Sequence, residues 1–321
     1  MEKAINDKRL MVRCAQMYYD EGFNQADISE KLGISKSTVS RILNSAIQNG
    51  IVKITVVNPY EYKFIEIEHI LEKKFGLKEA IIVEVNTDNI EVIKDELAKA
   101  GAAYLERIVK SDQIIGVTWG TTVKLIPRYI TNTKKNSLTF IPLSGGIGEA
   151  MFDLHPNQIA IDFAEKFRAN SKVLLAPSMV DDLDRKKLFM EERSINELMK
   201  LYDCLDIAVS GIGCPKLNTS TMISSGYYTE EQLQKLVNEG AVADVSNMLI
   251  DKNGDGSKFE SNSRIIGITL EQFRNAKLTI GIAGGTMKVE AIKAALKGNY
   301  LDVLILDLNA AMAIINNLEE E

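Results

Sequence analysis

The sequence predicts an α/β protein with two domains: a small N-terminal helix-turn-helix domain followed by a larger, doubly wound α/β domain. Apolar residues recur at helical spacing over the first part of the chain, whereas from about residue 78 apolar runs typical of strands alternate with helical patterns. Asn58 and Pro59 mark a break between these regions, and a length of 321 residues suits two domains. We therefore place the domains at residues 1–57 and 58–321.

The N-terminal domain is expected to hold three helices and a strand. Apolar residues spaced at helical intervals between 11 and 19 predict the first helix, and a second, short helix begins near Gln25. Gly33 then suits a turn with positive φ, and Ser35 is suited to cap the third helix. Residues 51–57, which are rich in β-branched side chains, predict a strand.

The third helix is expected to bury an apolar face made of Val39, Ile42, Leu43 and Ala46. At 3.6 residues per turn its opposite face then carries Ser, Asn and Arg, whereas a merely solvated face usually carries Glu and Lys. Small hydroxyl groups can bind DNA phosphates, and Arg41 can bind a guanine edge with two hydrogen bonds. An ordinary three-helix bundle with a solvated polar face is the alternative. The predicted DNA-binding residues are Lys36, Ser37, Thr38, Ser40, Arg41 and Asn44.

Strands and helices alternate in the larger domain, which predicts a mostly parallel sheet. The helical patterns between most of the strands cover residues 89–109, 122–130, 158–167, 229–238 and 287–296. A shorter helical pattern at 64–71 either packs on its own domain or contacts a partner chain. The predicted strands are 80–85, 113–117, 138–142, 172–176, 205–210, 264–268, 278–283 and 303–307.

Glycine-containing loops follow four of these strands, where parallel sheets usually bind ligands. Thr121 and Thr122 open a helix directly after a strand, so their hydroxyl groups and the free amides of the first turn suit a phosphate. Lys288 lies about one turn into another helix, and Asp244 and Asn247 either hydrogen-bond ligand hydroxyl groups or have a surface or turn role. Together they predict a pocket for a small anionic ligand. The four loops are 116–122, 144–146, 210–213 and 283–288.

Composition makes several other classes of protein improbable. The whole chain has a net charge of −6, whereas residues 1–58 carry eight basic and six acidic side chains, so only the N-terminal domain is suited to nucleic acid. Three widely spaced cysteines and two histidines favour neither a disulfide framework nor a metal site, and we expect no cofactor. No apolar run reaches about 18 residues and the N-terminus lacks a secretory pattern, so we expect a cytoplasmic protein without a membrane partner.

Taken together, these motifs resemble the bacterial transcriptional regulators of the SorC type, also described as the deoxyribonucleoside-regulator group. The resemblance covers essentially the whole chain. It implies an effector domain that is similar to sugar-phosphate isomerases and binds a phosphorylated sugar, and it implies homo-oligomers, dimers or tetramers, on operator DNA. It rests on Ser-Thr-Val-Ser-Arg at 37–41, Gly-Val-Thr-Trp-Gly-Thr at 116–121, Pro-Leu-Ser-Gly-Gly at 142–146, Gly-Ile-Gly at 211–213, Gly-Ala-Val-Ala-Asp at 240–244 and Gly-Gly at 284–285.

The resemblance also implies roles for ten residues of the effector domain. Two departures leave the sugar unidentified: the bulky aromatic residues that often follow Asp244 in the family are absent, and Asn247 replaces a glycine. Ser144 is not a lysine, so no imine with an aldehyde sugar can form there. The phosphate is assigned to Gly120, Thr121, Thr122, Gly284, Gly285 and Lys288, and the sugar to Gly145, Gly146, Gly213 and Asp244.

The function predicted from these residues is that of a DNA-binding regulator controlled by a sugar phosphate, not that of an enzyme. The alternative is a sugar-phosphate isomerase or deaminase-like enzyme with an appended DNA-binding module. Glu149, Asp153 and His155 lie near the second loop and could supply a general base, although His155 precedes Pro156 and is expected to cap or turn the chain. A pure oligomerisation module on a DNA-binding head would not need the four loops.

Overall fold

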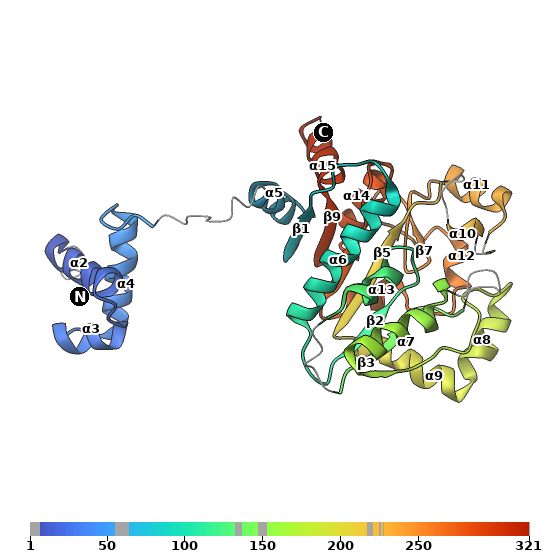
Figure 1. The fold of residues 1–321 in the computed structure, drawn as a ribbon, viewed down its shortest axis with the longest axis horizontal. Coiled ribbons are helices and arrows are strands. Elements are labelled where there is room, and N and C mark those ends of the chain that lie inside the picture. Colours follow the sequence, from blue (N-terminus) through green and yellow to red (C-terminus); the bar gives the residue numbers. More distant parts are fainter. Residues whose placement is uncertain are drawn as a thin grey trace. The chain divides into compact units, whose positions relative to one another are not determined.

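The chain divides into two compact units, Met1–Tyr62 and Lys63–Glu321 (Figure 1). The computed structural model describes residues 7–54, 64–131, 137–146, 153–216, 221–224, 226 and 228–320. The division at 62/63 and the expected boundary at 57/58 both fall at residues 55–63, outside the described residues.

The N-terminal unit contains the three predicted helices and the glycine turn. The Asn24 side chain caps α3 by accepting from two backbone amides of its first turn, and Gly33 ends α3 in the left-handed conformation with φ 63° and ψ 31°. Ser35 then caps α4 by accepting from the Thr38 amide at 3.2 Å. The helices are α2 (Lys8–Ala15), which continues into a π-helical turn (Gln16–Asp20), α3 (Gln25–Leu32) and α4 (Lys36–Gln48).

The apolar face predicted for the third helix forms much of the core of this unit. Val39, Ile42 and Ala46 are fully buried, and Leu43 is nearly so. They pack on apolar residues of α2 and α3, which confirms the helix-turn-helix arrangement. The strand predicted at 51–57 is absent from its described part, residues 51–54, and residues 55–57 lie outside the described residues.

The larger unit is built on a sheet whose main strands are all parallel, as predicted. The strands run in the order β1-β9-β8-β5-β2-β3-β4, and the hairpin β6–β7 pairs antiparallel with the end of β5. The strands are β1 (Glu79–Val83), β2 (Ile114–Val117), β3 (Thr139–Pro142), β4 (Asn170–Ser171), β5 (Ile207–Gly213), β6 (Ala243–Val245), β7 (Met248–Ile250), β8 (Thr279–Ile282) and β9 (Val303–Asp307).

The strand order reverses between β2 and β5. The chain first adds β3 and β4 on one side of β2, then returns to place β5 on the other side, followed by β8 and β9. Because the loops that leave β2 and β5 turn in opposite directions at this point, a crevice opens between them at the carboxyl edge of the sheet.

Helices cover both faces of the sheet. Within β5, Ile207 and Val209 pack on one side with α6, α7 and the 3-10 helix Val123–Tyr129, whereas Ala208 packs on the other with α5, α9, α14 and α15. The helices before β5 are α5 (Ile65–Phe75), α6 (Ile90–Ile108), α7 (Pro156–Phe167), α8 (Leu183–Glu191) and α9 (Arg193–Met199), and the last runs into a 3-10 helix (Lys200–Cys204). Those after it are α10 (Thr221–Ser224), α11 (Glu230–Asn238), α12 (Glu260–Ser263), α13 (Leu270–Arg274), α14 (Val289–Lys297), preceded by a 3-10 turn (Thr286–Lys288), and α15 (Leu308–Glu320).

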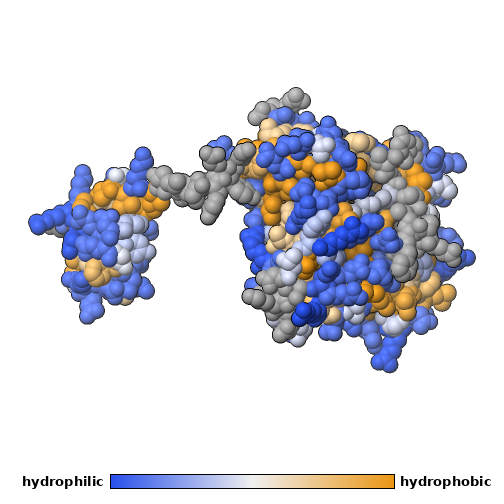
Figure 2. Space-filling model, viewed as in Figure 1, coloured by the Kyte–Doolittle hydropathy of each residue, from blue (hydrophilic) through white to orange (hydrophobic). Residues whose placement is uncertain are grey.

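Helix α5 packs on its own unit, which is one of the two alternatives considered for residues 64–71. Leu71 is fully buried against β1 and α15, and Phe64 and Ile67 pack beside it. The outward side of α5 leaves Ile65 and Ile70 about half exposed. Figure 2 shows that hydrophilic residues cover most of the visible face of each unit. Smaller hydrophobic patches lie among these hydrophilic residues.

Two predicted strands were wrong. In place of 172–176 the sheet contains only the two-residue β4, and residues 264–268 form isolated bridges from Ile265 to Met179 and from Gly267 to Ser144. Burial alternates from residue 173 to 176, but Pro177, which follows, has no amide to donate. Residues 176, 266 and 268 hydrogen-bond with loop 143–146 rather than with a strand. The predicted helix at 122–130 is a 3-10 helix that contains Pro127.

Candidate functional site

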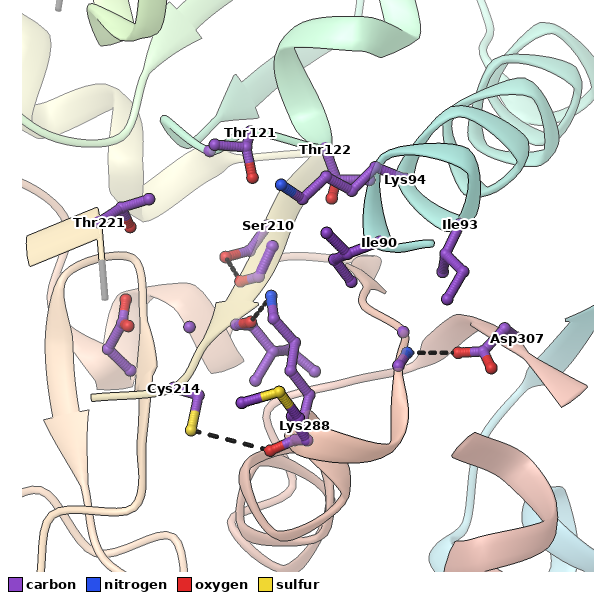
Figure 3. A pocket seen from close by; sticks show the side chains of 18 of the residues that line it. Ile90, Ile93, Lys94, Thr121, Thr122, Ser210, Cys214, Thr221, Lys288 and Asp307 are labelled. Carbon is purple, nitrogen blue, oxygen red and sulfur yellow. Dashed lines mark hydrogen bonds between the residues drawn. The ribbon is translucent and has the colours of Figure 1, made fainter. Parts of the chain in front are cut away.

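A cavity of about 510 Å³ lies where β2, β5, β8 and β9 end (Figure 3). Its walls are the loops that follow these strands, the first turns of α6 and the β6–β7 hairpin. It therefore occupies the crevice at the point where the strand order reverses. Eight of the ten predicted effector residues line it: Gly120, Thr121, Thr122, Gly213, Asp244, Gly284, Gly285 and Lys288.

The loop after β2 brings two threonines to the cavity. Thr118 is buried, and its amide continues the sheet by donating to the Val209 carbonyl at 3.0 Å. The chain then turns at Gly120, so that Thr121 and Thr122 border the cavity just before the 3-10 helix Val123–Tyr129 begins. Two hydroxyl groups are thereby placed at the end of a central strand.

The loop after β8 is held in place by Asp307, the last residue of β9. One carboxylate oxygen of Asp307 accepts from the Gly285 amide at 2.6 Å, and the other accepts from the Ala310 amide at the start of α15 at 3.1 Å. A Cβ on Gly284 would lie 2.5 Å from Asp307 Oδ2, and Gly285 has φ 88°, so both positions favour glycine. Asp307 itself is buried and lines the cavity.

Lys288 connects the loop after β8 to the end of β5. Its ammonium group donates to the Ile212 carbonyl at 2.7 Å, as Figure 3 shows. Burial lowers the pKa of Lys288, and the carboxylate of Asp244 opposes that change. The lysine thus already has a protein partner, the Ile212 carbonyl, in the ligand-free structure.

Asp244 stands on the hairpin side of the cavity. It lies on β6 opposite Gly213 of β5, where any side chain at position 213 would collide with its carboxylate. Burial raises the pKa of Asp244 to about 6, although the Lys288 ammonium and the Asn247 amide both favour the ionised form. Above that pH, Asp244 presents acceptor oxygens suited to hydroxyl groups.

Asn247 has a turn role, one of the two roles considered for it. Ser246 and Asn247 join β6 to β7 with φ values of 51° and 69°, as a two-residue hairpin turn requires. The indole N–H of Trp119 donates to the Asn247 side chain, which in turn donates to Ser178 Oγ at 2.9 Å. Asn247 is buried, so its amide supports the loop after β2.

Gly145 and Gly146 are not among the described residues that line the cavity. A Cβ on Gly145 would lie 2.5 Å from the Ala176 carbonyl oxygen, and one on Gly146 would collide with the His155 ring. Both glycines therefore serve close packing on the β3 side of the sheet. His155 caps α7, as expected, because its Nδ1 accepts from the Asn157 amide at 3.2 Å.

Two of the three residues considered as a general base are not brought to the cavity. Asp153 and His155 do not line it, and burial lowers the pKa of His155. Glu149 lies outside the described residues. The part of the chain that the structure describes holds no group of three or more His, Cys, Asp or Glu side chains suited to a metal ion.

Sequence reasoning missed several residues of the site. Lys94 and Glu91 lie on the first turns of α6, and Lys94 borders the cavity beside the threonine loop (Figure 3). An isolated lysine in a charged helix gives no sequence signal of such a role. Other lining residues that were not predicted include Asp88, Ile90, Ile93, Cys214, Asp307 and Asn309.

The predicted DNA-binding face of α4 is exposed, with one difference. Lys36, Ser37, Arg41 and Asn44 are exposed, and Ser40 is half-buried. Thr38 is 7% exposed, and its hydroxyl group hydrogen-bonds Ser35 Oγ at 2.8 Å. Thr38 therefore stabilises the start of α4, and we leave it out of the proposed DNA contacts.

Comparisons with known proteins match both units. Residues 62–316 match the family model described as "Putative sugar-binding domain", and residues 13–49 match Sigma-70, region 4. The deoxyribonucleoside regulator of Bacillus subtilis is 32% identical over 97% of this chain and 98% of its own length. The sorbitol operon regulator of Klebsiella pneumoniae is 28% identical over 97% of this chain and 98% of its own length.

Solved structures show the same fold. The full-length sorbitol operon regulator SorC from Klebsiella pneumoniae matches with a TM-score of 0.73 and 27% identity, covering 97% of this chain and 99% of that one. A DeoR family transcriptional regulator from Listeria monocytogenes matches with a TM-score of 0.72 and 32% identity, covering 78% of this chain and 98% of that one. The described residues contain no helix long and apolar enough to span a membrane.

Proposed function

The chain belongs to the SorC-type family of transcriptional regulators with a sugar-binding domain, and we propose that a phosphorylated sugar in the cavity controls its binding to operator DNA. The observation that carries this proposal is the cavity itself, which combines hydroxyl groups, ammonium groups and a carboxylate at the edge of a parallel sheet. Its relatives are named as regulators rather than enzymes. Asp153 and His155, which were considered as a general base, do not line the cavity.

The two sides of the cavity suit the two parts of a sugar phosphate. Thr121, Thr122 and Lys288 offer donors to a phosphate, and hydrogen bonds between charged groups are about twice as strong as neutral ones. Asp244 offers acceptors to sugar hydroxyl groups. Gly120, Gly284 and Gly285 allow the backbone to approach the phosphate closely, and Gly213 leaves room for the Asp244 carboxylate.

Calorimetry on the full chain tests the phosphate role, using sugars in free and phosphorylated form. We expect the phosphorylated form to bind more tightly, and Lys288→Ala to weaken its binding while operator binding by the ligand-free protein persists. Lys297→Ala, an exposed lysine at the other end of α14, is the matched control and is expected to bind like wild type. Equal affinity of the wild type for free and phosphorylated sugars would refute the phosphate role.

The DNA role is assigned to Lys36, Ser37, Ser40, Arg41 and Asn44 on α4. Arg41→Ala is expected to cost about 1–3 kcal/mol in specific operator binding if Arg41 contacts a base edge. Arg193→Ala removes the same charge from an exposed site on the effector unit and is the control. Operator affinity at the wild-type level in the first variant would contradict this assignment.

We further propose that the regulator acts as a homo-oligomer, a dimer or a tetramer, in the cytoplasm. One helix-turn-helix contacts few phosphates, so two linked copies gain affinity by binding two half-sites. The operator is then expected to be a near-palindrome with half-sites about one helical turn, or a multiple of it, apart. Light scattering on the full chain measures the oligomeric state, and a monomer that binds the operator at full affinity would contradict the proposal.

A further inference from the structure

Two lysines from different elements reach the same cavity. Lys288 precedes α14, and Lys94 lies one turn into α6, on the side of the cavity formed by Thr121 and Thr122 (Figure 3). The side chain of Lys94 is only 17% exposed although it lies near a helix end. Its ammonium group is therefore held against the wall of the cavity rather than out in solvent.

Lys94 forms an ion pair with Glu91, a residue one turn earlier on the same helix. Its ammonium group lies 2.7 Å from Glu91 Oε1, and the Glu91 side chain is 73% exposed. An ion pair one helical turn apart contributes only a few tenths of a kcal/mol when one partner is as exposed as Glu91, because water solvates that carboxylate almost as well as the lysine does. Glu91 can therefore give up Lys94 to a stronger anion at little cost.

The two ammonium groups also repel each other across the cavity. Burial lowers the pKa of Lys288, and the positive charge of Lys94 lowers it further. An anion placed between them would remove this repulsion and gain two charge-assisted hydrogen bonds. A dianion gains more than a monoanion because it can satisfy both cations together.

We propose that Lys94 is a specificity-determining residue, which exchanges Glu91 for the phosphate of the effector and so selects phosphate monoesters over sugars with a single carboxylate. This inference rests on the proposed function, because it assigns the phosphate to the same cavity. It adds that α6 contributes to the binding site, and it places the phosphate between Lys94, Lys288 and the hydroxyl groups of Thr121 and Thr122. The simpler alternative is that Lys94 and Glu91 form only a surface ion pair.

The experiment measures thermal stabilisation of the full chain by inorganic phosphate, with acetate as the monoanion probe. In the wild type we expect stabilisation by phosphate and little by acetate. Lys94→Gln is expected to raise the phosphate concentration needed for half-maximal stabilisation at least about tenfold, which corresponds to the loss of one hydrogen bond between charged groups. Unchanged sensitivity to phosphate in Lys94→Gln would overturn the inference.

Two further variants separate the exchange from a structural effect. Glu91→Gln breaks the same ion pair but leaves the lysine, so it is expected to bind phosphate at least as tightly as wild type. Lys99→Gln, on the same helix but paired with Asp95 and Glu96 outside the cavity, is expected to bind phosphate normally. Equal weakening in Glu91→Gln and Lys94→Gln would show that only the ion pair matters, and the inference would fail.

Failure of this inference can be told apart from failure of the proposed function. Wild-type protein is titrated with ribose 5-phosphate, glucose 6-phosphate and the two free sugars. If neither ester binds more tightly than its free sugar and inorganic phosphate does not stabilise the wild type, the proposed function fails and Lys94 loses its assignment with it. If an ester binds preferentially and Lys94→Gln keeps the same preference, only the role of Lys94 is wrong.

Discussion

Replacing Asp244 with asparagine should stabilise the ligand-free protein at neutral pH. The carboxylate lies in the wall of the cavity, where burial raises its pKa from about 3.8 to about 6. Folding therefore favours the protonated form, and ionisation of the folded protein costs free energy. Asparagine has nearly the same shape and can still accept a hydrogen bond from the Asn247 amide, but it carries no charge.

The magnitude follows from the difference between the two pKa values. About two pH units at ~1.4 kcal/mol each give up to ~3 kcal/mol of stability that the wild type has below about pH 4 and loses as the pH rises through about 6. For a unit of this size, 1 kcal/mol corresponds to roughly 2 °C in melting temperature, so Asp244→Asn should melt about 6 °C above the wild type at pH 7.5. At pH 4 the two proteins should melt within about 1 °C of each other.

The assay is a melting curve of the effector-unit transition in the full chain, recorded between pH 4 and 7.5 for wild type and variant. The same variant should bind a sugar phosphate more weakly at pH 7.5, because asparagine offers one acceptor oxygen in place of two. A variant that is less stable than wild type at pH 7.5, or a difference in melting temperature that does not depend on pH, would refute the reasoning about Asp244.

Three further predictions concern packing and oligomerisation. Gly145→Ala should destabilise the effector unit by about 1–3 kcal/mol in urea unfolding, because its Cβ would press on backbone carbonyl groups; unchanged stability would contradict the close approach. Leu71→Ala should cost about 2–5 kcal/mol and the half-exposed Ile70→Ala much less, and equal effects would mean that α5 does not pack on its own unit as described. Residues 1–62 alone should bind the operator far more weakly than the full chain, and equal affinity would argue against avidity.

The N-terminal unit could be predicted closely because its signals are local. Asparagine or serine before a helix, a glycine after one and apolar residues at helical spacing each act within a few residues. Ser35, Gly33 and the buried face of α4 are therefore found where expected. Thr38 was harder to place, because a hydroxyl group in the first turn of a helix can face DNA or the capping residue, and the local pattern does not decide between them.

The effector unit could be predicted less completely because its site depends on strand order. A parallel sheet brings all strand ends to one edge, which correctly suggested that the loops at 116–122 and 283–288 meet. The sequence alone does not reveal that β3 and β5 lie on opposite sides of β2. The β3 loop with Gly145 and Gly146 is consequently separated from the crevice, although its glycine pattern resembles that of the β8 loop.

The glycines at the strand ends therefore do not by themselves mark a binding site. Gly284 is required by the nearby Asp307 carboxylate and Gly145 by backbone carbonyl groups, so in both loops a tight contact within the protein explains the glycine. The two loops differ in their place relative to the cations: Lys94 and Lys288 line the same cavity as the loop after β8, and Gly145 and Gly146 do not line that cavity. A ligand site at such an edge is thus indicated by glycine together with cations at the point where strand order reverses, and the cation from α6 becomes visible only once the fold has brought it there.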